Sequence, residues 1–323
     1  MGQVIRVHVP GGAEVLKLET MEVGEPGAGE VRIAHTAIGV NFIDIYHRSG
    51  IYPLPQPFIP GMEGVGVIEA VGPDVTGFKP GDRVGYAGLV GSYCEKRLAR
   101  ADRLVRIPET ISDDQAAVLM LKGITAQVLL RQTYRVSPGD TILIHAAAGG
   151  LGSIMCQWAS ALGATVIGTV SSEEKAQVAR DNGCHHPIVY TRENFVERVN
   201  QITQGRKVAV VYDSVGKDTF TNSLDCLRPR GLMVVSGISS GAPPAVEAAT
   251  LAQKGSLFLT RAVVFAYTAT RAELDAAAAD LFEAVAAGHV RVAINQRYAL
   301  ADAATAHRDL ESRKTTGSTI LTV

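Results

Sequence analysis

Cysteine is scarce and scattered in this sequence of 323 residues, which contains only four, at Cys94, Cys156, Cys184 and Cys226. No two of them have the spacing of a structural zinc site, and so few in a chain of this length imply no disulfide framework. We therefore expect most of them to be small buried hydrophobic residues, in a reducing, cytoplasmic environment.

An excess of charge and a long apolar run are also missing. The formal net charge is −1, so no broad field attracts nucleic acid or an anionic membrane surface. No stretch of about 18 apolar residues could span a bilayer, and the N-terminal residues lack the apolar core of a signal peptide. The composition predicts a cytoplasmic protein that acts on a small molecule and has no membrane partner. It argues against nucleic acid as a partner.

Two textures divide the sequence. Residues 1–124 contain short apolar runs between glycine and proline turns, as in a partly open β-barrel, at 4–9, 30–38, 64–71 and 83–86. From Thr125 onward strands alternate with helices. This alternation predicts an α/β fold with a doubly wound parallel sheet of six strands, at 141–145, 164–170, 187–190, 207–212, 231–236 and 256–261.

The alternation stops after Arg261. An alanine-rich helix over 271–288 precedes a strand, a helix and a strand at 295–298, 301–312 and 318–323. These pieces have no place in a six-stranded sheet, so we expect them to return to the first domain. The sequence thus predicts a nucleotide-binding domain, 125–261, inserted into a discontinuous catalytic domain, 1–124 and 262–323. Cofactor and substrate would meet in the cleft between the two.

A turn of small residues follows the strand at 141–145 and precedes a helix at about 151–162. It reads Ala147-x-Gly149-x-x-Gly152, with alanine in place of the first glycine of the dinucleotide-binding G-x-G-x-x-G pattern. Small residues let the backbone approach a pyrophosphate, and the helix directs its free N–H groups at that anion. Because a strand and a helix flank the turn, we favour dinucleotide binding over a merely tight turn.

The end of the next strand indicates which dinucleotide is bound. A site for NAD usually has Asp or Glu there, whereas this chain has Ser171 and Ser172, followed by Lys175. Two hydroxyls and an ammonium suit a 2′-phosphate, and Tyr190 could line the same pocket, so we favour NADPH. The alternative is that the serines cap the helix that begins near Glu173, and both roles are compatible.

Several separate stretches together resemble the zinc-independent quinone oxidoreductases (zeta-crystallin-like) of the medium-chain dehydrogenase/reductase superfamily. The resemblance covers nearly the whole chain and depends on the stretches 11–16, 39–53, 61–66, 78–84, 121–125, 146–152 and 211–216. It implies a Rossmann domain, a GroES-like barrel domain, and NADPH-dependent reduction of a quinone or another conjugated carbonyl without flavin.

The resemblance also assigns positions to cofactor contacts. It places Asn41, Tyr46, Gly237, Ile238 and Phe265 near the nicotinamide. It places the pyrophosphate at Gly149, Gly150 and Leu151, and the adenosine phosphate at Ser172, Lys175 and Tyr190. A C-terminal arginine that reaches the cofactor in the family corresponds to Arg313. Gln127 departs from the family, which often has an aromatic residue there.

No zinc site is expected. The stretch that resembles the Gly-His-Glu of zinc-dependent relatives is Gly61-Met62-Glu63, and no cysteine lies near Asn41, where the first ligand would fall. A thioether cannot replace an imidazole as a zinc ligand. A quinone needs no Lewis acid, because delocalisation in the acceptor takes up the charge of the incoming hydride.

For catalysis we favour Tyr46 as the hydrogen-bond donor to the developing oxyanion, followed by Asn41 and Tyr52. Packing against nearby prolines is as good an explanation of Tyr52, and Asp44 and Arg48 are expected to pair. Rival functions are a 2-alkenal or enone reductase, and a nucleotide-binding structural (crystallin-like) or RNA-binding protein.

The apolar outer strand at 256–261 predicts a homodimer.

Overall fold

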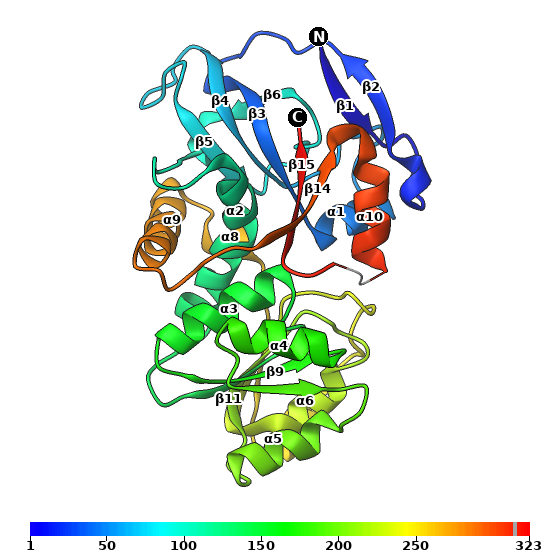
Figure 1. The fold of residues 1–323 in the computed structure, drawn as a ribbon, viewed down its shortest axis with the longest axis vertical. Helices are drawn as coiled ribbons and strands as arrows, with labels where there is room; N and C mark the ends of the chain where they lie inside the picture. The colour runs from blue at the N-terminus through cyan, green and yellow to red at the C-terminus, as the bar shows by residue number, and fades with distance from the viewer. Residues whose placement is uncertain (313–314) are drawn as a thin grey trace. The chain divides into compact units, whose positions relative to one another are not determined.

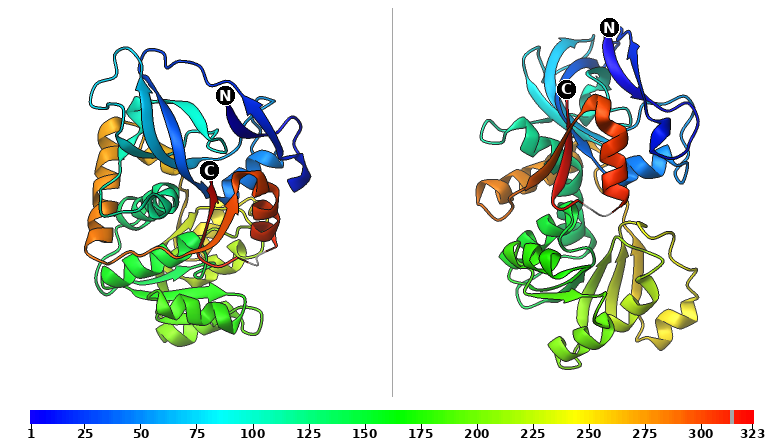
Figure 2. Two further views of the ribbon diagram at one scale, coloured as in Figure 1. Left: turned by 45° about the horizontal axis from the view of Figure 1, so that its top comes forward. Right: turned by 45° about the vertical axis from the view of Figure 1, so that its right-hand side comes forward.

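The computed structural model describes residues 1–312 and 315–323, and its chain divides into two compact units (Figures 1 and 2). Unit 1 comprises Met1–Ile124, Thr268–Phe282 and Val292–Val323. Unit 2 comprises Thr125–Tyr267 and Glu283–Arg291.

Unit 1 is built on a sheet in which β14, β15, β3, β4, β5 and β7 follow one another, and β6 also pairs with β3. Only β14 and β15 are parallel, and β1 and β2 form a separate antiparallel pair. The strands are β1 Gly2–Arg6, β2 Lys17–Met21, β3 Glu30–Val40, β4 Glu63–Val71, β5 Arg83–Ala87, β6 Lys96–Arg100, β7 Val105–Arg106, β14 Ile294–Ala299 and β15 Ser318–Thr322.

Strand β3 organises unit 1 because its two halves serve different apolar cores. Val31 and Ile33 pack in a cluster with residues of β4 and β5, whereas Ile38 and Val40 pack with β1 and the C-terminal segment. Strand β15 pairs with the end of β3, so the C-terminal strand belongs to the same sheet as β3. Figure 1 shows β15 beside β3.

Four α-helices have described residues in unit 1: α1 Phe42–Arg48, α2 Asp113–Gln127, α9 Arg271–Ala286 and α10 Ala303–Glu311. The sequence predicted α9 and α10 but neither α1 nor α2. Helix α1 follows β3 after a single residue, so the end of the central strand positions it.

Unit 2 is the predicted doubly wound sheet, with all six strands parallel in the order β10-β9-β8-β11-β12-β13. Helices α3 and α4 lie on one side of it, and α5 and α6 on the other (Figures 1 and 2). The strands are β8 Thr141–Ile144, β9 Thr165–Val170, β10 His186–Val189, β11 Val208–Asp213, β12 Leu227–Val235 and β13 Phe258–Arg261. The helices are η3 Val128–Thr133, a π-helix, then α3 Gly150–Ala161, α4 Glu173–Asp181, α5 Phe195–Thr203, α6 Phe220–Cys226, α7 Ala248–Gln253 and α8 Val264–Tyr267.

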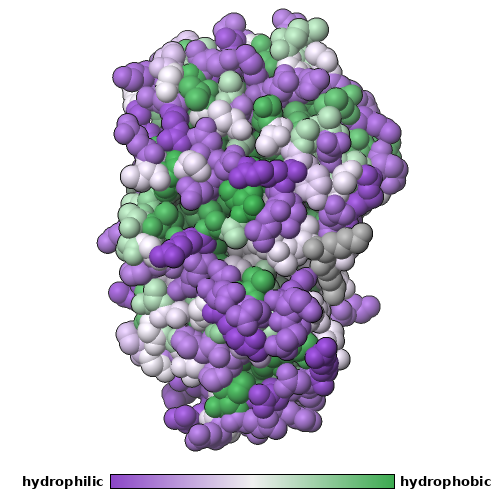
Figure 3. Space-filling model, viewed as in Figure 1, coloured by the Kyte–Doolittle hydropathy of each residue, from purple (hydrophilic) through white to green (hydrophobic). Residues whose placement is uncertain are grey.

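Among the described residues there is neither a disulfide bond nor a membrane-spanning helix. The four cysteines are free and buried, as expected. No helix among residues 1–312 and 315–323 is long and apolar enough to cross a membrane, and polar side chains cover most of the face drawn in Figure 3.

Candidate active site

The small-residue turn between β8 and α3 forms an anion cradle. Gly149 is the N-cap of α3, so the N–H groups of Gly150, Leu151 and Gly152 have no partner within the helix. A Cβ at Gly152 would lie 2.3 Å from the carbonyl oxygen of Ala146. Only glycine therefore lets the helix start this close to the strand, and the residues present fit a pyrophosphate.

This cradle lies where the order of the parallel strands reverses. Strand β8 has β9 on one side and β11 on the other, which is the position at which open α/β sheets bind ligands. Asp213 ends β11, and its buried Oδ1 accepts hydrogen bonds from the N–H groups of Val215 (2.8 Å) and Gly216 (3.0 Å) and from Thr219 Oγ1 (2.9 Å). Asp213 thus fixes the neighbouring loop, a role that the sequence analysis missed.

The ends of β9 and β10 bring the adenosine-side candidates together. Ser172 Oγ accepts a hydrogen bond from the Lys175 N–H at 3.3 Å, so the predicted cap is confirmed. The carbonyl of Ser171 accepts from Thr191 Oγ1 at 3.1 Å. Tyr190 directly follows β10 and is exposed. The side chains that were expected to read the 2′-phosphate therefore come from neighbouring strand ends and the first turn of α4.

Four further candidates lie elsewhere in unit 2 or beyond the described residues. Gly237 follows β12 and packs against Ser214, because a Cβ at this glycine would lie 2.6 Å from the Ser214 carbonyl oxygen. Ile238 is the next residue. Phe265 belongs to α8, which packs on η3. Arg313 lies outside the described residues. Gln127 is buried, and its Oε1 accepts a hydrogen bond from Gln132 Nε2 at 2.7 Å.

In unit 1, α1 brings the three catalytic candidates together. Asn41 precedes the helix and Tyr46 lies in it, both of them buried. The Tyr46 and Tyr52 rings meet edge to face with their centroids 5.2 Å apart. The Tyr52 N–H also donates to the Tyr46 carbonyl at 3.0 Å, so this contact with Tyr46 is present in addition to any packing by the prolines.

Glu63 and Lys122 complete this cluster. Glu63 is fully buried, and its two oxygens accept from the Leu121 N–H (2.6 Å) and from Asn41 Nδ2 (2.9 Å). Lys122 Nζ lies 3.5 Å from Glu63 Oε2 and 3.2 Å from the carbonyl oxygen of Val40. Burial raises the pKa of the Glu63 carboxyl, and the ammonium of Lys122 opposes that rise.

The expected pair of Asp44 with Arg48 is wrong. Asp44 Oδ2 accepts from the Asn41 N–H (2.9 Å), which caps α1, and from Tyr93 Oη (3.0 Å). Arg48 instead makes two hydrogen bonds, of 2.7 and 2.9 Å, with Glu311 at the end of α10. Nothing local in the sequence indicates a partner 263 positions away.

A buried chain of polar groups links the two helices. Tyr93 Oη lies 2.9 Å from His307 Nε2, and Arg48 lies 3.3 Å from His307 Nδ1. Burial raises the pKa of Asp44 to about 7 and lowers that of His307 to about 3. The chain thus holds α1, and with it Asn41 and Tyr46, against α10.

Met62 occupies the position at which zinc-dependent relatives have a ligand histidine, and it is buried next to Glu63 in the sequence. Within the described residues, no three His, Cys, Asp or Glu side chains gather as a metal site.

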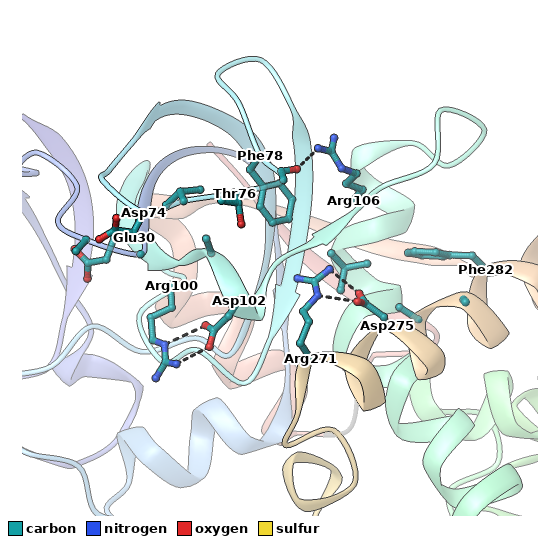
Figure 4. Close-up of a pocket in the computed structure, with 18 residues that line it drawn as sticks. Glu30, Asp74, Thr76, Phe78, Arg100, Asp102, Arg106, Arg271, Asp275 and Phe282 are labelled. Carbon is teal, nitrogen blue, oxygen red and sulfur yellow. Dashed lines mark hydrogen bonds and ion pairs between the residues drawn. The ribbon is translucent and has the colours of Figure 1, made fainter.

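A separate cavity of about 1020 Å³ lies in unit 1 between loops of the sheet and α9 (Figure 4). Its cations already have partners: Arg271 pairs with Asp275 at 2.6 Å and Arg100 with Asp102 at 2.5 Å. None of the sequence-derived candidates lines this cavity, so it is not the site described above.

Comparison with known proteins places the chain. The alcohol dehydrogenase GroES-like domain family matches residues 27–109, and the zinc-binding dehydrogenase family matches 150–283. A quinone oxidoreductase of Pseudomonas aeruginosa is 52% identical over 99% of both chains. The chain belongs to the quinone oxidoreductase family. It is therefore an oxidoreductase of the medium-chain dehydrogenase/reductase superfamily, as the resemblance implied.

Two further relatives of this oxidoreductase are informative. A 2-haloacrylate reductase of a Burkholderia species is 49% identical, over 98% of this chain and 97% of its own. The crystal structure of Escherichia coli quinone oxidoreductase complexed with NADPH superposes with a TM-score of 0.97, at 47% identity, and covers 99% of this chain and 100% of that one.

The sequence analysis missed Glu63, Lys122 and Asp213 as contributors to the site. Glu63 and Lys122 both lie in stretches that carried the resemblance, but a pair 59 positions apart gives no local signal. Asp213 directly follows the predicted strand 207–212, and Gly216 lies three residues further on. A strand-end carboxylate before a turn was the available indication.

Proposed function

We propose that this oxidoreductase catalyses NADPH-dependent reduction of quinones by direct hydride transfer, without flavin or metal. Bound NADPH supplies the hydride. The observation that carries the proposal is the cradle formed by Gly149, Gly150 and Leu151 at the start of α3. The next strand is followed by serine hydroxyls where a carboxylate is usual, and the first turn of α4 adds the Lys175 ammonium beside Glu173 and Glu174. The E. coli relative, whose structure contains NADPH, supports it.

Within this proposal each candidate has a role. Gly149, Gly150 and Leu151 hold the pyrophosphate through backbone N–H groups. The adenosine 2′-phosphate is held by Ser171, Ser172, Lys175 and Tyr190. The nicotinamide contacts are Asn41, Tyr46, Gly237, Ile238 and Phe265, with Arg313 as a further cofactor contact. Residues 125–261 bind NADPH, and residues 1–124 with 262–323 form the catalytic domain.

Tyr46 donates a hydrogen bond to the oxygen of the quinone on which negative charge develops, with Asn41 and Tyr52 beside it. This charge is stabilised most when the donors are already in place before the reaction. The capping of α1 by Asp44 and the contact between Tyr46 and Tyr52 provide that order.

The 2-haloacrylate reductase supports a second candidate activity, reduction of an activated C=C bond at the same site. Turnover of NADPH with a benzoquinone, a naphthoquinone, 2-chloroacrylate and an unsaturated aldehyde separates the two activities. We expect the highest kcat/KM with a quinone. A higher kcat/KM with the acrylate or aldehyde favours the second candidate. Oxidation of NADPH at the background rate with every acceptor favours a structural or RNA-binding role.

We also propose that the protein is cytoplasmic and forms a homodimer through β13. Phe258 and Leu259 on this strand are exposed, at 61% and 39%. The strand is the outermost of the six-stranded sheet, so its free edge can pair with a second copy.

A further inference from the structure

The ammonium group of Lys122 lies at the end of β3, next to the residues proposed to bind the reacting quinone. Its ammonium is 3.2 Å from the Val40 carbonyl oxygen, immediately before Asn41, and 3.5 Å from Glu63 Oε2. Asn41 Nδ2 donates to that same Glu63 oxygen at 2.9 Å. One carboxylate oxygen therefore connects the lysine and the asparagine.

The geometry differs from that of a simple buried ion pair. The two oxygens of Glu63 already accept shorter hydrogen bonds, from the Leu121 N–H and the Asn41 amide, and the lysine is the most distant of the three donors. A lysine placed only to neutralise a carboxylate approaches to about 2.7–2.9 Å. The two contacts of the ammonium also use two of its three protons.

Exposure separates the two partners. The Glu63 side chain is 0% exposed, whereas that of Lys122 is 12% exposed, so part of the lysine side chain reaches a surface that the carboxylate does not. Asp44 is a second buried carboxyl close enough for the charge of Lys122 to oppose the rise in its pKa. Lys122 thus lies within electrostatic reach of two buried carboxyl groups.

We propose that Lys122 is an electrostatic catalyst that stabilises the negative charge developing on the acceptor oxygen during hydride transfer, with Glu63 and the Val40 carbonyl positioning its ammonium. This proposal rests on the proposed function. The acceptor gains two electrons and one hydrogen as hydride, its oxygen becomes an anion, and solvent then protonates that anion. A charge fixed in place before the reaction costs no reorganisation when the anion forms.

The test compares wild type, Lys122→Met and the double variant Lys122→Met with Glu63→Gln. Lys96→Met is the matched control, because Lys96 on β6 also pairs with a glutamate, Glu69 on β4, at 2.6 Å. Each protein is assayed for kcat and KM with a benzoquinone, for NADPH affinity by fluorescence titration, and for stability in urea.

We expect Lys122→Met to lower kcat by roughly 100-fold with little change in the KM for quinone, because the charge acts only as the anion forms. NADPH affinity should stay within about 3-fold of wild type. Lys122→Met should also lower the urea midpoint, since it leaves the Glu63 carboxylate buried without its cation. The double variant removes the buried charge but keeps one acceptor oxygen where Glu63 has two, so it should recover part of the midpoint and none of kcat. Lys96→Met should match wild type in kcat.

Recovery of kcat in the double variant would overturn the proposal, because the lysine would then serve only to hold the fold. Unchanged kcat in Lys122→Met, with an active wild type, would also overturn it and leave the proposed function intact. If the wild type itself fails to oxidise NADPH with any quinone, the proposed function falls, and this inference falls with it.

Discussion

At the scale of single residues, specificity for the cofactor depends on a few polar groups at the end of β9. Ser172 is already used as the cap of α4, so its hydroxyl has a structural partner in the Lys175 N–H. The Lys175 ammonium carries the charge that would distinguish a 2′-phosphate from a hydroxyl. Selectivity for NADPH should therefore depend more on Lys175 than on either serine.

Replacing Lys175 with alanine should weaken NADPH binding by roughly 10-fold or more and leave NADH binding nearly unchanged, because one charge-assisted contact is lost. Fluorescence titration with the two nucleotides measures the ratio. Lys254→Ala is the control, since Lys254 pairs with Asp225 elsewhere in unit 2. An unchanged ratio in Lys175→Ala would place the 2′-phosphate elsewhere.

The hydroxyl of Tyr46 should assist the reaction without being indispensable. Tyr46→Phe keeps the ring that packs edge to face on Tyr52 and removes the donor. We expect kcat to fall by about 2- to 10-fold, the worth of one hydrogen bond. The control is Tyr298→Phe, which removes a hydroxyl bound to Asp309 at 2.8 Å on α10 and β14. Complete loss of turnover in a folded Tyr46→Phe would instead identify an obligatory proton donor.

At the scale of the elements, the start of α3 has the strictest requirement. A Cβ at Gly152 would meet the Ala146 carbonyl at 2.3 Å, so Gly152→Ala must push the helix away from β8. We expect a loss of about 1–3 kcal/mol in the free energy of unfolding and weaker NADPH binding. Thermal unfolding and nucleotide titration measure both.

Gly24→Ala provides the control for that change, because a Cβ at Gly24 meets nothing within 4 Å. The two variants add the same atom to the chain. If Gly152→Ala binds NADPH as tightly as Gly24→Ala does, the close start of α3 is not part of the cradle.

The packing of α10 should depend on pH through His307. Burial lowers the pKa of His307 to about 3 from its usual 6.5, so in the folded protein it stays neutral while the unfolded chain takes up a proton. The free energy of unfolding therefore falls as pH drops below 6.5, by up to about 1.4 kcal/mol per pH unit. Between pH 7 and 5 the wild type should lose about 2 kcal/mol more than His307→Gln.

Urea unfolding at the two pH values measures this difference. Asp44, whose raised pKa of about 7 has the opposite effect, is present in both proteins and cancels. His289→Gln, at an exposed histidine in unit 2, should keep the wild-type loss. Equal losses in His307→Gln and wild type would show that His307 is not held neutral.

The elements that the sequence predicted and those it missed differ in their pattern of burial. The inner strands β8, β9 and β11 of unit 2 are buried along nearly their whole length and form continuous apolar runs, which are easy to recognise. Helix α2 is hidden for a related reason, because Ala116, Ala117, Val118, Leu119 and Met120 are all buried and show no helical period. Helix α1 has only seven residues and depends on Asp44 for its cap.

The candidate site divides in the same way. The cradle and the end of β9 follow from local spacing, so the sequence was sufficient to propose them. The link between Asn41, Glu63 and Lys122 joins three distant positions, and only the pairing of β3 with β4 and the packing of α2 bring them together. Such contacts leave no trace in a single sequence.

At the scale of the whole molecule, the free edge of β13 should govern association. Replacing the exposed Phe258 with lysine should place a charge on the edge and shift the protein from dimer to monomer. Sedimentation velocity at low micromolar concentration measures the change. Val9→Lys, at a side chain 65% exposed in unit 1, is the matched control and should stay dimeric. A monomeric wild type would contradict the proposed dimer.

The chemistry itself is tested most directly by single-turnover oxidation of NADPH carrying deuterium at the transferred C4 position. Enzyme that has been shown by elemental analysis and absorbance to contain neither metal nor flavin is mixed rapidly with NADPH and a quinone. We predict that one hydroquinone forms per NADPH and that deuterium slows the step. Turnover that appears only after stoichiometric zinc or flavin is added, or no oxidation of NADPH at all, would contradict direct hydride transfer by this protein.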